Sequence, residues 1–193
     1  MRIYLLILSL LLVGLGLAQT AEESKKKLAG GNPLQVLLIT GGCCHNYLFQ
    51  SLALTTGVEK RVNAEFTVVN EGGTGTRGKI DLYNNPDWAK PYDVVVHNEC
   101  FAATDDPEYI RKITAAHKAG TPSVVIHCAM HTYRDAQIDD WREFLGVTSR
   151  HHEHQSNYPV RIVKKDHPIM KGFKKDWVTA KDELYIIKKL WPK

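Results

Sequence analysis

The stretch VVIHCAMHTYR, residues 124–134, has the pattern of a buried strand that ends abruptly in a polar turn. Three β-branched aliphatic residues lead directly into His127, Cys128 and His131. A short apolar run of this kind is typical of a strand that is covered on both faces, as in parallel sheets. The turn could hold a nucleophilic cysteine, histidines that bind a metal, or only a packed corner.

Apolar runs of this type alternate with helical patterns along the chain. The predicted strands are residues 35–40, 64–70, 92–98 and 122–128, with later strands at 158–163 and 183–187, and the predicted helices are residues 47–61, 106–119 and 137–146. Asp106 followed by Pro107 indicates a helix start, and Gly120 and Gly146 indicate helix ends. This alternation predicts an α/β fold with a parallel sheet and helices on both faces.

The first 18 residues predict a signal peptide. Arg2 precedes an apolar run of about 16 residues, and the small residues Gly16 and Ala18 favour cleavage before Gln19. The alternative is an uncleaved membrane anchor, although a spanning helix needs about 20 residues. Polar residues 19–32 predict a flexible linker, and residues 33–193 one folded domain. We therefore expect export to the periplasm or beyond, with membrane contact only through an uncleaved signal.

Composition excludes some partners and leaves the cysteines open. The net charge is +4, and the C-terminal lysines are interleaved with acidic residues, so no nucleic-acid partner is expected. An exported chain could keep disulfides. The adjacent Cys43 and Cys44 are not expected to bridge to each other, whereas Cys100 could pair with Cys128, or all four could be buried thiols. The oligomeric state is not predicted.

Three of the predicted strands end in histidines. These are His45 after the first strand, His97 at the end of the third, and His127 and His131 after the fourth. Ligands of parallel α/β sheets bind beyond the carboxyl ends of the strands, so we expect a functional pocket at this edge. Imidazoles there could bind a divalent metal, act as general acid and base, or hydrogen-bond sugar hydroxyls.

Two spacings suggest metal ligands. His127-x-x-x-His131 would place both rings on one face if a helix begins there, and HHEH (151–154) offers alternate histidines that face one way. We expect zinc or manganese to be held by His45, His131 and His154, with a metal-free site as the alternative.

The motifs GGCCHNY, VVVHN, VVIHCAMHTYR, WREFLG, DHPIMKGF and DELY occur in this order between Leu34 and Tyr185. As an ordered set they resemble the trehalose-utilisation (ThuA-like) family, which is similar in fold to the class I glutamine amidotransferases. The resemblance implies a flavodoxin-like parallel sheet. Family domains normally continue beyond DELY, so the C-terminal part of this domain is expected to be incomplete.

The same resemblance bears on the cysteine in the turn. Amidotransferases place a nucleophilic cysteine in a sharp turn that commonly reads GICYGMQ. Aligning its methionine with Met130 puts His127 at the nucleophile position and Cys128 one residue late, whereas aligning the cysteines leaves Met130 unmatched. We expect Cys128 to be a small buried residue. A cysteine-dependent hydrolase, with His131 or His154 as base, is the least favoured reading.

The resemblance implies action on trehalose-type disaccharides or their keto-derivatives. Isomerising or cleaving a keto-sugar needs acid–base groups, for which we expect Glu99, His127 and His131, and a cation such as a metal or Arg134. The expected substrate contacts are Tyr47, Asn98, Tyr133 and Arg134. The alternative is a non-catalytic carbohydrate-binding module, which needs no activated base. Histidines outnumber aromatic residues at the predicted edge, which favours an enzyme.

Overall fold

The computed structural model describes residues 31–173 and 176–192. The predicted signal peptide, and the predicted linker up to residue 30, lie outside these ranges. Within them, every helix is too short or too polar to cross a bilayer.

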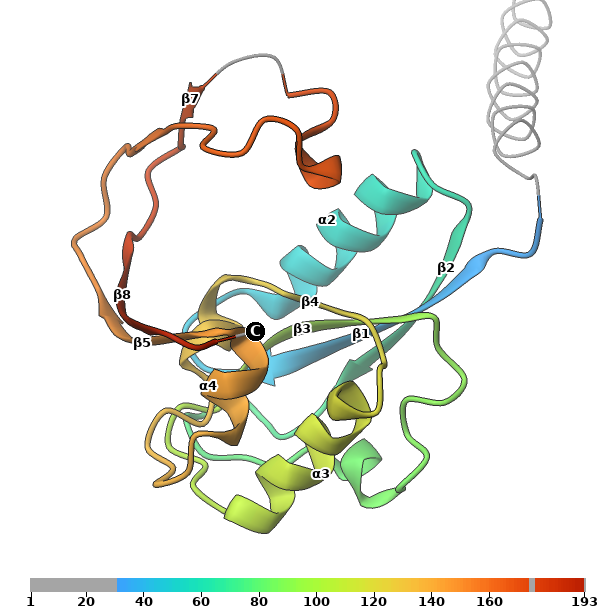
Figure 1. The fold of residues 1–193 in the computed structure, drawn as a ribbon. Helices are drawn as coiled ribbons and strands as arrows, with labels where there is room; N and C mark the ends of the chain where they lie inside the picture. The colour runs from blue at the N-terminus through green and yellow to red at the C-terminus, as the bar shows by residue number, and fades with distance from the viewer. Residues whose placement is uncertain (1–30, 174–175, 193) are drawn as a thin grey trace, which may run out of the picture.

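Four parallel strands form the central sheet (Figure 1). Their spatial order is β2 (Ala64–Asn70), β1 (Leu34–Gly42), β3 (Val94–Cys100) and β4 (Ser123–Val125). Helix α2 (Tyr47–Glu59) lies on one face, and α3 (Pro107–Lys118) and α4 (Asp140–Leu145) lie on the other. The expected α/β fold, with a parallel sheet and helices on both faces, is confirmed.

The main core lies between the sheet and α3. Leu37 and Ile39 of β1 are fully buried against Ile110 and Ile113 of α3, four aliphatic side chains whose burial is a large favourable term. The side chain of Asp106 accepts hydrogen bonds from the first backbone N–H groups of α3, which confirms the helix start that the sequence predicted.

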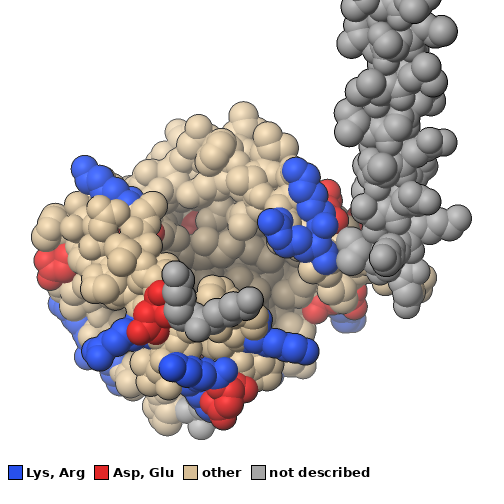
Figure 2. Space-filling view, turned by 90° about the horizontal axis from the view of Figure 1, so that it is seen from above, with Lys and Arg blue, Asp and Glu red and all other residues tan. Residues whose placement is uncertain are grey.

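The opposite face is less well covered. Of the residues in α2, only Tyr47 and Ser51 are buried, and Leu48, Phe49 and Leu52 are exposed. Seen from above, the face that contains α2 is hollowed and largely uncharged, with Lys and Arg gathered at its edges (Figure 2).

The fourth strand is shorter than predicted. It ends at Val125, and a 3-10 helix, η2 (His127–His131), follows. His127 has φ +47°, a left-handed conformation that cannot continue a strand. The predicted strand 122–128 is therefore wrong at its end. A 3-10 helix has three residues per turn, so residues four apart in η2 do not share a face as they would in an α-helix.

Two antiparallel ribbons follow α4. β5 (Val147–His152) pairs with β8 (Tyr185–Leu190), and β6 (Pro159–Val160) pairs with β7 (Trp177–Val178). The remaining elements are the 3-10 helices η1 (Asp81–Asn84) and η3 (Pro168–Met170). The strand predicted at 158–163 shrinks to two residues, and that at 183–187 shifts to β8. The β5–β8 ribbon packs beside η2, at the carboxyl end of the sheet.

Candidate functional site

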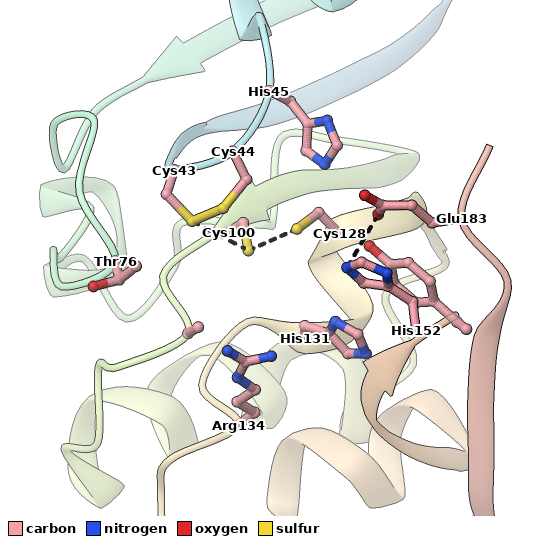
Figure 3. A pocket seen from close by; sticks show the side chains of 12 residues that line it. Cys43, Cys44, His45, Thr76, Cys100, Cys128, His131, Arg134, His152 and Glu183 are labelled. Atoms are coloured by element: carbon pink, nitrogen blue, oxygen red, sulfur yellow. Dashed lines mark hydrogen bonds and ion pairs between the residues drawn. A yellow bond between two sulfur atoms is a disulfide. The ribbon is translucent and has the colours of Figure 1, made fainter. Parts of the chain in front are cut away.

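A cavity of about 180 Å³ lies at the edge of the sheet where the sequence predicted a pocket (Figure 3). Its walls come from the loops after β1, β2, β3 and β4 and from the β5–β8 ribbon with the residues just before β8. The lining residues are Cys43, Cys44, His45, Thr76, Cys100, Ala102, Cys128, His131, Arg134, His152, Glu183 and Tyr185.

Three potential metal ligands converge beside this cavity. One side-chain ligand atom each of His45, His127 and Glu183 lies within 4.8 Å of the others. The two imidazole rings meet edge to face, with their centroids 5.0 Å apart. His45 Nε2 is buried and has no hydrogen-bond partner in the described part of the chain. Because buried polar atoms are normally paired, this nitrogen fits a site that a ligand completes. Two imidazoles and a carboxylate suit zinc or manganese.

Local structure holds these side chains in place. Asn46 caps α2 by accepting a hydrogen bond from the Phe49 N–H, which positions His45 just before the helix. The left-handed turn directs His127 out of the sheet, and Glu183 lies two residues before β8 begins.

A carboxylate orients the ring of His127. Its Nε2 lies 3.0 Å from Asp182 Oδ1, and its Nδ1 lies 3.3 Å from the Tyr185 hydroxyl. Partial burial alone would raise the pKa of Asp182, but the Glu183 N–H and the His127 ring hold it below its usual value. Metal-binding histidines commonly have such a carboxylate partner.

His131 is a neutral imidazole in the cavity wall. Burial lowers its pKa to about 4, and Arg134 and His152 add to this effect. Its Nε2 lies 2.9 Å from Ser149 Oγ, and its ring stacks on Tyr185 with centroids 4.2 Å apart and planes 3° from parallel. His131 is therefore uncharged at neutral pH.

Arg134 supplies a cation to the cavity. Its Nη1 donates a hydrogen bond to the Arg150 carbonyl oxygen at 3.2 Å, which holds the guanidinium along the wall.

Several residues that the sequence proposed for the site lie outside the cavity. Glu99 is fully buried and accepts from the Tyr83 hydroxyl at 3.4 Å. Asn98 donates to Gln50 Oε1. Tyr133 is enclosed in the core. These three side chains point into the protein because alternate residues of β3 face its two covered sides and because Tyr133 packs against α3 and α4. None of them is placed to touch a ligand in the cavity.

Tyr47 lies just below the cavity. Its hydroxyl donates to the Cys43 carbonyl oxygen at 2.8 Å, so it braces the loop that carries the cavity cysteines rather than lining the wall.

The predicted metal set of His45, His131 and His154 is not assembled. His154 is exposed, and its carbonyl oxygen accepts a hydrogen bond from the Tyr158 hydroxyl. β5 ends at His152, which pairs with Tyr185, so the chain has left the cavity before residue 154. Sequence reasoning missed Glu183 and Tyr185 as cavity residues, although both belong to the DELY motif and that motif was the available signal.

The cysteines also depart from expectation. Cys43 and Cys44 form a disulfide, so the expectation that they would not bridge to each other is wrong. Cys100 and Cys128 are free, buried thiols. In the turn after β4, His127 and not Cys128 has the left-handed backbone.

Comparisons with known proteins give a consistent result. The trehalose utilisation (ThuA) family matches residues 35–193. A crystal structure described as ThuA-like, from Parabacteroides merdae ATCC 43184, has 22% sequence identity and a TM-score of 0.56 over 80% of this chain and 63% of that chain. This chain thus spans 63% of that protein, and at this identity the likeness shows the fold alone. No curated protein matches.

Proposed function

The chain belongs to the trehalose-utilisation (ThuA) family, and on this premise we propose that it is an exported sugar-active enzyme. Its substrates are trehalose-type disaccharides or their keto-derivatives, and its chemistry is acid–base, assisted by a divalent metal. The observation that carries the proposal is the convergence of His45, His127 and Glu183 beside the cavity.

The ligand set fits zinc or manganese. Among the described residues, Nε2 of His45 has no hydrogen-bond partner. His127 offers Nδ1, because its contact with the Tyr185 hydroxyl is longer than the contact of His127 Nε2 with Asp182. Asp182 fixes the orientation of the His127 ring. When bound, such an ion would polarise a sugar carbonyl or hydroxyl oxygen.

Other residues would handle the proton and the charge. His131 is neutral at pH 7, so its free Nδ1 can accept a proton that leaves the substrate. Arg134 can offset negative charge that develops on a substrate oxygen. Glu99 is a positioning residue in this proposal, because it has no access to the cavity.

The size of the cavity limits the substrate. Its volume of about 180 Å³ lies below the roughly 300–1,000 Å³ of common ligand pockets. A cavity of this size suits one sugar ring, with the second ring of a disaccharide outside it.

Carbohydrate binding without catalysis is the second candidate. The stacked rings of His131 and Tyr185 favour it, because a wall of stacked rings can bind a sugar face without any activated base.

Metal analysis of the full-length chain tests the proposal. We expect about one equivalent of zinc or manganese in the wild type, and loss of the metal in His45→Ala and in Glu183→Gln. His151→Ala, an exposed histidine of the same β5 strand as His152, is the matched control and should keep the metal.

Turnover of a keto-disaccharide, followed by NMR, should fall with the metal content. Metal-bound protein that is inactive on keto-disaccharides would contradict the substrate. Folded, metal-free protein that binds a disaccharide without turning it over would favour the carbohydrate-binding module over the enzyme.

A further inference from the structure

Four sulfur atoms lie in a row along one wall of the cavity (Figure 3). Cys44 is bonded to Cys43. Cys43 Sγ lies 4.0 Å from Cys100 Sγ, and Cys100 Sγ lies 2.9 Å from Cys128 Sγ. The row runs from the exposed Cys44 to the buried Cys100 and Cys128. Each sulfur therefore has a neighbour with which it can exchange a bond.

The backbone fixes this arrangement. Gly42 has φ +91°, and a Cβ at this position would lie 2.2 Å from the Cys100 carbonyl oxygen. Only glycine permits this close approach. The Cys43 N–H then donates to the same carbonyl oxygen at 3.1 Å, which holds the disulfide over the end of β3. The turn after β4 brings Cys128 to the other side of Cys100.

We propose that the four cysteines form a thiol–disulfide exchange centre, in which one disulfide moves between Cys43–Cys44 and Cys100–Cys128. The proposal does not depend on the sugar chemistry or on the metal.

The first exchange forms a mixed disulfide. The Cys100 thiol releases its proton to solvent through the cavity, and its thiolate then attacks Cys43 Sγ. A Cys43–Cys100 bond forms, the Cys43–Cys44 bond breaks, and Cys44 leaves as a thiolate that takes a proton from water at the surface.

The second exchange completes the transfer. Cys128 releases its proton to solvent through the cavity, and its thiolate attacks Cys100 Sγ. A Cys100–Cys128 bond forms, and Cys43 leaves and is protonated. One disulfide and two thiols are present before and after, so the isomerisation needs no external oxidant or reductant.

Disulfide mapping tests the proposal on the full-length chain that contains one disulfide. The protein is held without oxygen at pH 8, acidified to stop exchange, alkylated in denaturant and digested with trypsin. Cys43 and Cys44 share one tryptic peptide, whereas Cys100 and Cys128 fall in two others, so each pairing has its own mass. We expect both the Cys43–Cys44 and the Cys100–Cys128 forms in the wild type, in a ratio that does not change on tenfold dilution.

Two variants separate the steps. In Cys128→Ser the second exchange is blocked, so a Cys43–Cys100 cross-link should accumulate. In Cys100→Ser both exchanges are blocked, and the disulfide should stay at Cys43–Cys44. Circular dichroism checks that each variant is folded. If a variant is not folded, the disulfide pairings found in the wild type decide whether the proposal holds. A wild type that shows only Cys43–Cys44, or cross-links that appear only between chains, would overturn the proposal.

Discussion

His97 Nδ1 lies 2.9 Å from Glu99 Oε1, and both side chains are fully buried. The hydrogen bonds of the neighbouring His117 indicate how many protons the His97–Glu99 pair holds. His117 Nδ1 faces the Thr121 carbonyl oxygen at 2.9 Å, so that nitrogen carries a hydrogen, and His117 Nε2 accepts from His97 Nε2 at 2.9 Å. One proton is then shared between His97 Nδ1 and Glu99 Oε1. Whichever atom holds it, the buried network has no net charge, which avoids the cost of an isolated buried charge.

Replacement of Glu99 tests its role as a positioning residue. Glu99→Ala removes the partner of His97 and should lower the free energy of unfolding by about 3 kcal/mol, measured by urea denaturation. Glu99→Gln should cost less, because its amide can donate to His97 Nδ1. Glu99→Gln should also keep most of the turnover per folded molecule. A loss of turnover above a hundredfold in stable Glu99→Gln protein would restore Glu99 as the catalytic base.

The pH dependence of stability should reflect His117. Burial lowers its pKa to about 4, whereas histidine in an unfolded chain titrates near 6.5. The unfolded chain therefore binds more protons between these values, and stability falls as the pH drops from 6.5 towards 4. The contribution is up to about 1.4 kcal/mol per pH unit and vanishes above pH 6.5.

Urea unfolding from pH 4.5 to 8 measures this slope. His117→Gln should show a shallower slope, and His151→Ala should match the wild type. Equal slopes in wild type and His117→Gln would contradict the assignment.

Removal of the Tyr133 hydroxyl should cost no stability. This hydroxyl is buried and lacks a hydrogen-bond partner among the described residues. Leaving a buried polar group unpaired is unfavourable, so Tyr133→Phe should be as stable as the wild type or more stable by about 1 kcal/mol. Its Michaelis constant should be unchanged, because Tyr133 does not line the cavity. A large rise in the Michaelis constant would place Tyr133 back among the substrate contacts.

Asp182 should tune metal affinity through His127. Asp182→Asn removes the charge that faces His127 Nε2, and it should weaken zinc binding by 10-fold to 100-fold in a chelator competition. Its effect on stability should stay below about 1 kcal/mol, because the carboxylate is half exposed. Asp166→Asn, an exposed acid outside the cavity, is the matched control. Unchanged zinc affinity in Asp182→Asn would remove the carboxylate–histidine pair from the site.

The sequence predicted those parts of the molecule that depend on local pattern. Strands β1, β2 and β3 were placed within a few residues because each is an apolar run with clear ends, and α3 because Asp106 and Pro107 mark its start. The edge of the sheet that carries the cavity followed from strand direction alone.

What the sequence could not predict depends on contacts between distant segments. β4 ends early because His127 has a left-handed backbone. A histidine in the sequence does not by itself predict that conformation. The choice of His152 over His154 depends on where β5 pairs with β8. Glu99 was expected to be catalytic because it lies at the end of a strand, but its side chain is fully buried and does not reach the cavity.

The side chains that converge beside the cavity come from nearly opposite ends of the described chain, with His45 just before α2 and Glu183 just before β8. Protein synthesis delivers them in that order, so Glu183 is the last of the three to be made. All four strands of the sheet precede Glu183 in the chain. His45, His127 and Glu183 therefore converge only when the β5–β8 ribbon has formed beside the sheet.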